Sequence, residues 1–316
     1  MTVKGFLCIG LLLAMPLLGG CGNDETTPQP QDKGADTASQ QGVSQSATPK
    51  DTATRIISLG GPVTEIIYAL GAEQGVVAID ISSTYPPAAQ KLPKVGYQRT
   101  LSAENILALR PTMVLASSEA GPPTAITQIK AAGVPMTIIP SEHSVEGAKA
   151  KIRAVASALN HTAEGERLCT ALDSSMTQAN KLREGQSTTP SVLFIYARGA
   201  GAVQASGSGT AADAMIALGG GKNAISGYEG YKPLTPESAV AARPDLVLMT
   251  TSGLQSVGGI DGLLRTAPGL AETPAGRNRR IVALDDELLL GFGPRLGEAT
   301  LQLVEMLHKG SKGATP

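Results

Sequence analysis

The sequence predicts an α/β protein of two lobes, each built on a parallel sheet, joined by a single long helix. Its 316 residues exceed the size of one typical domain, so two hydrophobic cores are expected. Short apolar runs alternate with helical patterns over residues 54–139, and the same rhythm restarts after Pro190. Between these regions, residues 144–184 keep a helical periodicity without a proline. Strands that alternate with helices indicate parallel sheets covered on both faces.

The overall charge argues against one class of partner. The chain carries 26 Lys and Arg against 27 Asp and Glu, a formal net charge of −1 at pH 7. Proteins that bind the phosphates of nucleic acid carry a clear positive excess. We therefore expect no nucleic-acid partner.

The first 53 residues are typical of a targeting signal followed by a linker. Residues 1–20 hold an early Lys4 and an apolar run over residues 6–18, and small residues precede Cys21. This pattern resembles a bacterial lipoprotein signal peptide, in which Cys21 would become the lipidated first residue of the mature protein. The alternative is a membrane-spanning helix, but the run is shorter than the roughly 20 residues that a span needs. Residues 21–53 are polar, which predicts a disordered tether.

This N-terminus predicts an extracytoplasmic protein that is lipid-anchored to the bacterial cell membrane. It also determines whether the three cysteines can form a disulfide. Cys8 leaves with the signal and Cys21 carries the lipid, so Cys169 stays unpaired and no intramolecular disulfide is expected.

The N-terminal lobe is expected over residues 54–161. The Gly60-Gly61-Pro62 turn leads from a first buried strand into a helix that Gly71 closes. Strands are expected at residues 55–59, 76–79, 113–116 and 136–139, and helices at residues 63–70, 102–109 and 124–132. Ligands of such sheets bind at the loops beyond the strand ends.

A long helix is expected to join the lobes over residues 162–186. Asn160 and His161 interrupt the helical pattern, and Thr162 is a suitable N-cap with Glu164 in the first turn. At 1.5 Å per residue, residues 163–184 would extend roughly 33 Å, which is enough to cross from one lobe to the other. The alternative is an ordinary amphipathic helix on one lobe. The position of this helix in the middle of the chain favours a helix that joins the two lobes.

The C-terminal lobe is expected over residues 187–312. Its strands are expected at residues 191–196, 245–250 and 280–284, and its helices at residues 210–218, 259–264 and 295–308. An internal repeat relates it to the first lobe, because residues 101–115 align without gaps on residues 234–248. Each copy reads as a helix cap, a glutamate, an amphipathic turn, an Arg-Pro stop and a buried strand. Glu104 and Glu237 therefore occupy equivalent places, one on each lobe.

The most informative short stretch is residues 94–104, which holds Tyr97, Arg99 and Glu104 between two apolar segments. A phenolate is an anionic oxygen ligand for ferric iron, and tyrosine is one of the axial ligands of heme. A neighbouring arginine can stabilise an ionised phenol or pair with a carboxylate of a ligand. The alternative is a β-turn that carries a surface tyrosine.

The chain from Arg55 onward resembles the substrate-binding lipoproteins of bacterial heme ABC importers, within the larger group that carries corrinoids and ferric siderophores. The resemblance extends over roughly 260 residues in the same order. It is carried by residues 58–71, 95–104, 207–216, 230–237, 257–262 and 291–295, and by the Arg110-Pro pair. It implies a class III periplasmic binding protein, with the ligand held in the cleft between the lobes.

The resemblance also implies roles for individual residues. Tyr97 matches the iron ligand for a transported heme b, and Arg99 matches the arginine that supports it. Arg198 stands where some members carry a histidine as sixth iron ligand; an arginine cannot coordinate iron, so it would meet a heme propionate or remain an exposed loop charge. Tyr231 would line the heme pocket; the alternatives are that it packs in the core or anchors its loop.

Partners follow from the same resemblance. In the corrinoid and siderophore relatives, glutamates on the two lobes dock onto the permease. Glu104 and Glu237 match them, and the simpler role of each is to cap its helix. The expected partners are heme, the importer's permease dimer and its ATPase, and the membrane through the lipid anchor.

Two alternative functions stay open. A corrinoid or ferric-siderophore carrier belongs to the same importer class. An extracytoplasmic α/β enzyme is the less favoured alternative, because the sequence offers no pattern of nucleophile and base.

Overall fold

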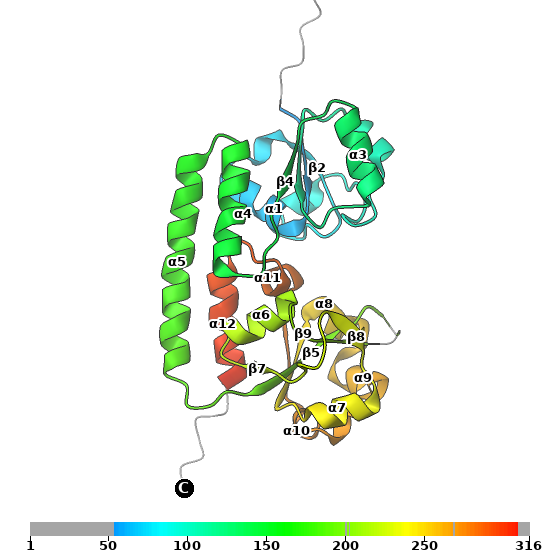
Figure 1. The fold of residues 1–316 in the computed structure, drawn as a ribbon, viewed down its shortest axis with the longest axis vertical. Coiled ribbons are helices and arrows are strands. Elements are labelled where there is room, and N and C mark those ends of the chain that lie inside the picture. Colours follow the sequence, from blue (N-terminus) through cyan, green and yellow to red (C-terminus); the bar gives the residue numbers. More distant parts are fainter. Residues whose placement is uncertain (1–53, 200, 202, 268, 309–316) are drawn as a thin grey trace, which may run out of the picture. The chain divides into compact units, whose positions relative to one another are not determined.

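The computed structural model describes residues 54–199, 201, 203–267 and 269–308. The predicted signal peptide and tether, including Cys21, lie outside these residues. Figure 1 shows the α/β lobes of the described part and the long helix beside them. Within this part, no helix combines the length and the apolar character that a membrane crossing requires.

The N-terminal lobe is a four-stranded parallel sheet, as predicted. The elements are β1 (Ile56–Leu59), α1 (Gly61–Ala69), β2 (Val76–Ile79), α2 (Ala103–Leu107), β3 (Met113–Ser117), α3 (Pro123–Ala131), β4 (Met136–Ile139) and the 3-10 turns Glu73–Gly75 and Ala89–Lys91. The strand order is β2-β1-β3-β4. Side chains alternate between the two faces of the sheet: Ile57 packs toward α2 and α3, while Leu115 packs toward α1 and the next helix, α4 (Val145–Ala158).

The long helix follows a break at the predicted place. Helix α4 (Val145–Ala158) ends before Asn160, whose φ of 60° is left-handed, and α5 (Thr162–Glu184) begins two residues later. The N-cap is His161 rather than Thr162, because Thr162 is already the first helical residue. Helix α5 packs against α4 of the first lobe and against α12 (Leu296–His308) of the second (Figure 1). It therefore joins the two lobes.

The C-terminal lobe has a mixed sheet, which corrects the expectation of a wholly parallel one. The strands are β5 (Ser191–Tyr196), β6 (Gln204–Ser206), β7 (Lys222–Asn223), β8 (Tyr231–Pro233), β9 (Leu246–Thr250) and β10 (Ile281–Leu284). Strands β10, β9 and β5 pair in parallel, whereas β6 pairs antiparallel with both β5 and β8. The link between β5 and β6 is too short for the crossover that parallel pairing requires.

Short helices cover this second sheet. They are α6 (Ala211–Leu218), α7 (Pro236–Ala242), α8 (Thr251–Ser256), α9 (Gly259–Thr266), α10 (Pro274–Arg277), α11 (Asp286–Leu290) and the 3-10 turn Leu270–Glu272. One apolar cluster continues from Ile66 on α1 and Ile152 on α4, through Leu172 on α5, to Phe194 on β5 and Leu303 on α12. The two lobes therefore share a core along the long helix.

The internal repeat is confirmed in the backbone. Ser102 accepts a hydrogen bond from the N–H of Asn105 at 3.3 Å, and Thr235 accepts one from the N–H of Ser238 at 3.2 Å. In each copy an arginine with a left-handed backbone follows the helix, with φ of 46° at Arg110 and 43° at Arg243. Each then enters a strand of its own sheet, β3 or β9.

Candidate ligand-binding site

A cavity of about 610 Å³ lies between the two lobes. Its N-terminal wall comes from the loops that follow β1, β2, β3 and β4, and its other wall from the end of β5, the start of α6, β8 and α11. This is where parallel sheets present their ligand sites, and the volume suits a small molecule. The four pocket residues predicted from the sequence all line this cavity: Tyr97, Arg99, Arg198 and Tyr231.

Tyr97 stands on a tight turn. Gly96, with φ of 105°, lets the chain enter the turn, and the N–H of Thr100 donates to the carbonyl of Tyr97 at 2.9 Å. The N–H of Gly121 donates to the carbonyl of Gln98 at 2.8 Å, which ties the turn to the loop after β3. Tyr97 therefore lies both on a β-turn and at the cavity, because the turn holds the half-buried tyrosine at the cavity wall.

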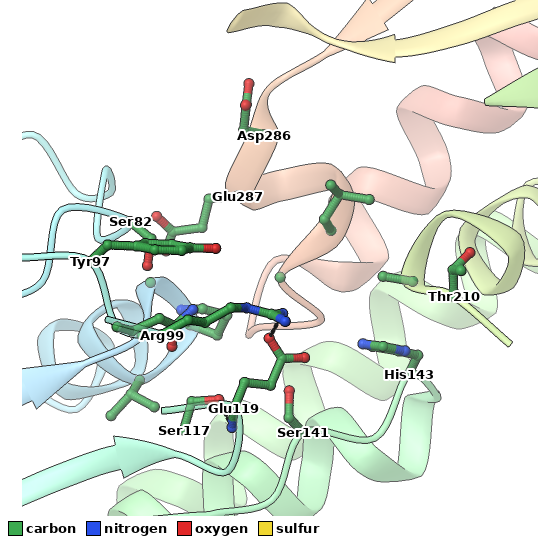
Figure 2. Close-up of a pocket in the computed structure, with 18 of the residues that line it drawn as sticks. Ser82, Tyr97, Arg99, Ser117, Glu119, Ser141, His143, Thr210, Asp286 and Glu287 are labelled. Carbon is green, nitrogen blue, oxygen red and sulfur yellow. Dashed lines mark hydrogen bonds and ion pairs between the residues drawn. The ribbon is translucent and has the colours of Figure 1, made fainter. Parts of the chain in front are cut away.

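Arg99 extends from the same turn and forms an ion pair with Glu119 (Figure 2). Glu119 follows β3, and its N–H donates to the hydroxyl of Ser117 at 3.2 Å. The guanidinium is therefore held at the N-terminal wall by a carboxylate of the protein itself.

Arg198 approaches Tyr97 from the opposite lobe. Its guanidinium carbon lies 5.7 Å from the centroid of the Tyr97 ring and 5.5 Å from that of Tyr196. Both distances are within the range of a cation–π contact. Arg198 remains exposed to solvent and lines the cavity, so it is free to meet an anionic group of a ligand.

The C-terminal wall is aromatic. The rings of Tyr196 and Tyr231 lie 5.9 Å apart, and Tyr231 is 6.4 Å from Phe194. Burial raises the pKa of Tyr231. Its hydroxyl therefore keeps its proton at neutral pH. Tyr231 is 38% exposed and lines the cavity, so it is not a core residue. The place of Tyr196 in this wall could not be predicted, because in the sequence it is only the last residue of an expected strand.

Polar contacts between the lobes form what we call the lobe junction. In each contact, a group of residues 54–161 meets a group of residues 285–295, close to the cavity. The contacts are Arg295 with Glu65 at 2.9 and 3.1 Å, Lys151 with the carbonyls of Gly291 and Phe292 at 2.8 and 3.2 Å, and Glu287 with Thr84 at 2.9 Å and Tyr85 at 3.1 Å. These contacts could not be predicted from the sequence, because the partners lie far apart in the chain.

Glu287 is the most perturbed carboxyl group of the lobe junction. Its Oε2 accepts all three hydrogen bonds from Thr84 and Tyr85, while its buried Oε1 has no partner among the described residues. Burial, reinforced by the charge of Glu65, raises the pKa of Glu287 to about 7.

Glu104 and Glu237 lie outside the cavity. Each is exposed in the first turn of its helix, α2 or α7. Hydrogen bonds from its own N–H and from Thr235 lower the pKa of Glu237. The N-cap of α7 is Thr235, in a capping box with Ser238, and both glutamates are exposed to a partner.

The chain matches the family model described as periplasmic binding protein over residues 56–288. Among solved structures, it is similar to the periplasmic heme-binding protein RhuT from Roseiflexus sp. RS-1 in its apo form. The two are 48% identical with a TM-score of 0.80, over 82% of this chain and 100% of that one. It is also similar to the periplasmic heme-binding protein BhuT in complex with two hemes. Identity is 47% and the TM-score 0.76, over 80% of this chain and 97% of that one.

Curated relatives are more distant. An uncharacterized ABC transporter substrate-binding lipoprotein, YvrC of Bacillus subtilis, is 28% identical over 98% of each chain. A vitamin B12-binding protein of Pectobacterium carotovorum is 24% identical over 83% of this chain and 91% of its own.

Proposed function

Because the chain belongs to the periplasmic binding protein family, we propose that it captures heme b in the cavity between its lobes and delivers it to an ABC importer. The observation that carries this proposal is the meeting of Tyr97 and Arg198 across the cavity, 5.7 Å from guanidinium carbon to ring centroid. An ionised phenol gives ferric iron an anionic oxygen ligand, and an adjacent cation stabilises the ionised form. Tyr196 and Tyr231 add an aromatic wall suited to a flat, apolar ring system.

The test is a tyrosine-to-phenylalanine exchange at the cavity wall. Tyr97→Phe keeps the ring beside Arg198 but removes the iron-binding oxygen. We expect the variant to lose the tyrosinate-to-iron charge-transfer absorption and most of its affinity for ferric heme. Tyr68→Phe, on α1 outside the cavity, is the matched control and should behave as wild type. Unchanged spectra in Tyr97→Phe would remove the ligand assignment.

Heme is favoured over a corrinoid because similarity to heme-binding structures reaches 48% identity, against 24% for the vitamin B12-binding relative described above. Titration with ferric heme and with cobalamin under the same conditions separates the two. Tight binding of cobalamin alone would replace heme as the ligand.

The protein would work outside the cytoplasm, held at the membrane by lipid on Cys21 and docked on a permease dimer with its ATPase. A substrate-binding protein has to stay near its permease, and a lipid anchor raises its local concentration there. Cys21→Ser in the full chain should release the protein from the membrane fraction. Retention of that variant would argue for a different anchor.

A further inference from the structure

Lys151 is a buried ammonium group at the cavity. It lies on α4, its residue is only 3% exposed, and it lines the cavity. Its Nζ donates to the carbonyl oxygens of Gly291 at 2.8 Å and Phe292 at 3.2 Å. Two of its three donors are therefore used, and both of these contacts are with neutral groups.

The carboxylates around Lys151 are committed elsewhere. Glu65 holds Arg295 with both of its oxygens, and Glu119 holds Arg99. Among the described residues, no carboxylate oxygen lies within ion-pair distance of Lys151. A buried charge without a counter-charge is costly, and a group of the bound ligand is the remaining source of one.

The charge balance of the cavity wall agrees with this. Burial lowers the pKa of Lys151 to about 8, so it is still mainly charged at pH 7. Burial also lowers the pKa of His143, which leaves that imidazole neutral. With a pKa of about 7, Glu287 carries only part of a negative charge at neutral pH, so the cations Arg99, Lys151 and Arg198 still exceed the carboxylates Glu119, Asp286 and Glu287 on the wall. The cavity is therefore suited to a ligand that brings negative charge.

We propose that Lys151 is a ligand-binding residue whose free N–H receives a carboxylate of the bound tetrapyrrole. This inference rests on the proposed heme function and names a contact made by its propionate groups. The competing role is purely structural: Lys151 caps the end of α11 and helps to hold the lobe junction, whatever is bound.

The experiment compares two ligands that differ only in their carboxylates, ferric heme and ferric heme dimethyl ester. In wild type, heme should bind more tightly than the ester. Lys151→Met should weaken heme binding by about 10- to 100-fold, the range of a charge-assisted hydrogen bond, and leave ester binding unchanged. Lys149→Met is the matched control on the same helix, because Lys149 pairs with Glu146 and Asp173 and does not line the cavity.

Several outcomes would overturn the inference, and they can be told apart. If Lys151→Met lowered the affinity for heme and for the ester equally, Lys151 would have a structural role alone. If it lowered neither affinity, Lys151 would not take part in ligand binding. Failure of wild type to bind either compound would overturn the proposed function and this inference together. A Tyr97-dependent heme spectrum in wild type, combined with equal losses in Lys151→Met, would overturn the inference only.

A pH series gives a second, independent measurement. The ratio of heme affinity to ester affinity in wild type should fall above about pH 8 as Lys151 loses its proton, and should stay flat in Lys151→Met. Using the ratio removes titrations that affect both ligands alike. The charged and titratable groups facing Lys151 from the packed elements are Glu65 on α1, Arg99 and Glu119 on the N-terminal wall, His143 before α4, Glu287 on α11 and Arg295 before α12. A flat ratio in wild type would contradict the contact.

Discussion

Arg295 donates two parallel hydrogen bonds to Glu65, from Nε to Oε1 at 2.9 Å and from Nη2 to Oε2 at 3.1 Å, although 230 residues separate them. Glu65 is 4% exposed, and the guanidinium carbon of Arg295 lies 3.5 Å from the centroid of the Tyr85 ring. This bidentate pair is a strong link between the lobes, because the partners fix each other's geometry away from water.

Breaking this pair from one side should be strongly destabilising. Arg295→Met leaves the buried Glu65 carboxylate without its partner, and we expect it to lower the free energy of unfolding by about 3–5 kcal/mol. Glu65→Ala should cost less, because the side chain of Arg295 is 20% exposed and keeps some contact with water. The double variant should cost clearly less than the sum of the two single changes. Urea unfolding measures all three.

The chain supplies a control with the same geometry at the surface. Arg153 and Glu166 also form a bidentate pair, at 2.7 and 3.0 Å, but their side chains are 47% and 53% exposed. Arg153→Met should lower the free energy of unfolding far less than Arg295→Met does, because water screens an exposed pair. Equal losses at the two sites would show that burial does not set the strength of the pair at Glu65.

Glu287→Gln should make stability less sensitive to pH. The folded state raises the pKa of Glu287 from 4.5 to about 7, so between these values it holds a proton that the unfolded chain has lost. Stability contributed by this group is therefore present below about pH 4.5 and is lost as pH rises through 7, by about 3 kcal/mol at most. Glutamine imitates the protonated acid at every pH. The difference in melting temperature between variant and wild type should grow from pH 4.5 to 7 and then level off. Parallel curves would contradict the raised pKa.

The ferric complex should be five-coordinate and mainly high-spin. Arg198 stands on the wall opposite Tyr97, and a guanidinium cannot coordinate iron. Arg198→His places an imidazole at this position and should convert a large part of the complex to a six-coordinate, low-spin form. Electron paramagnetic resonance distinguishes the two states. A dominant low-spin signal in wild type would mean that a second strong ligand exists.

Docking on the permease should depend on Glu104 and Glu237. Both are exposed in equivalent turns of the repeat, and neither lines the cavity. Charge pairs at a wet rim mainly set orientation and association rate. The double change to lysine should leave heme affinity unchanged and abolish carrier-stimulated ATP hydrolysis by the reconstituted importer.

Charge alone has to be controlled in that experiment. Glu184→Lys with Glu305→Lys makes the same change in net charge at exposed positions of α5 and α12. This control should keep full stimulation. Loss of stimulation in both double variants would point to a general charge effect rather than to docking.

The sequence predicted the lobes and most strands closely because buried strands and amphipathic helices carry a local period. Tyr97 could also be found, since a tyrosine two residues before an arginine in a polar turn is a local pattern. Lys151 could not, because a lysine in an amphipathic helix is typical of a solvent-facing charge, and the carbonyls that it meets, those of Gly291 and Phe292, lie 140 and 141 residues away in the chain. The antiparallel strands β6 and β8 were missed because each has only three residues.

The core that runs from Ile66 through Leu172 to Leu303 has a consequence for the chain as a folding unit. Neither half of the polypeptide can bury its apolar surface alone, because α5 packs against both α4 and α12. A chain divided at Pro190 should therefore yield two fragments that aggregate when made separately and recover a soluble fold when produced together. Heat should likewise melt the intact protein in a single calorimetric peak, since the lobes are architectural halves of one cooperative domain.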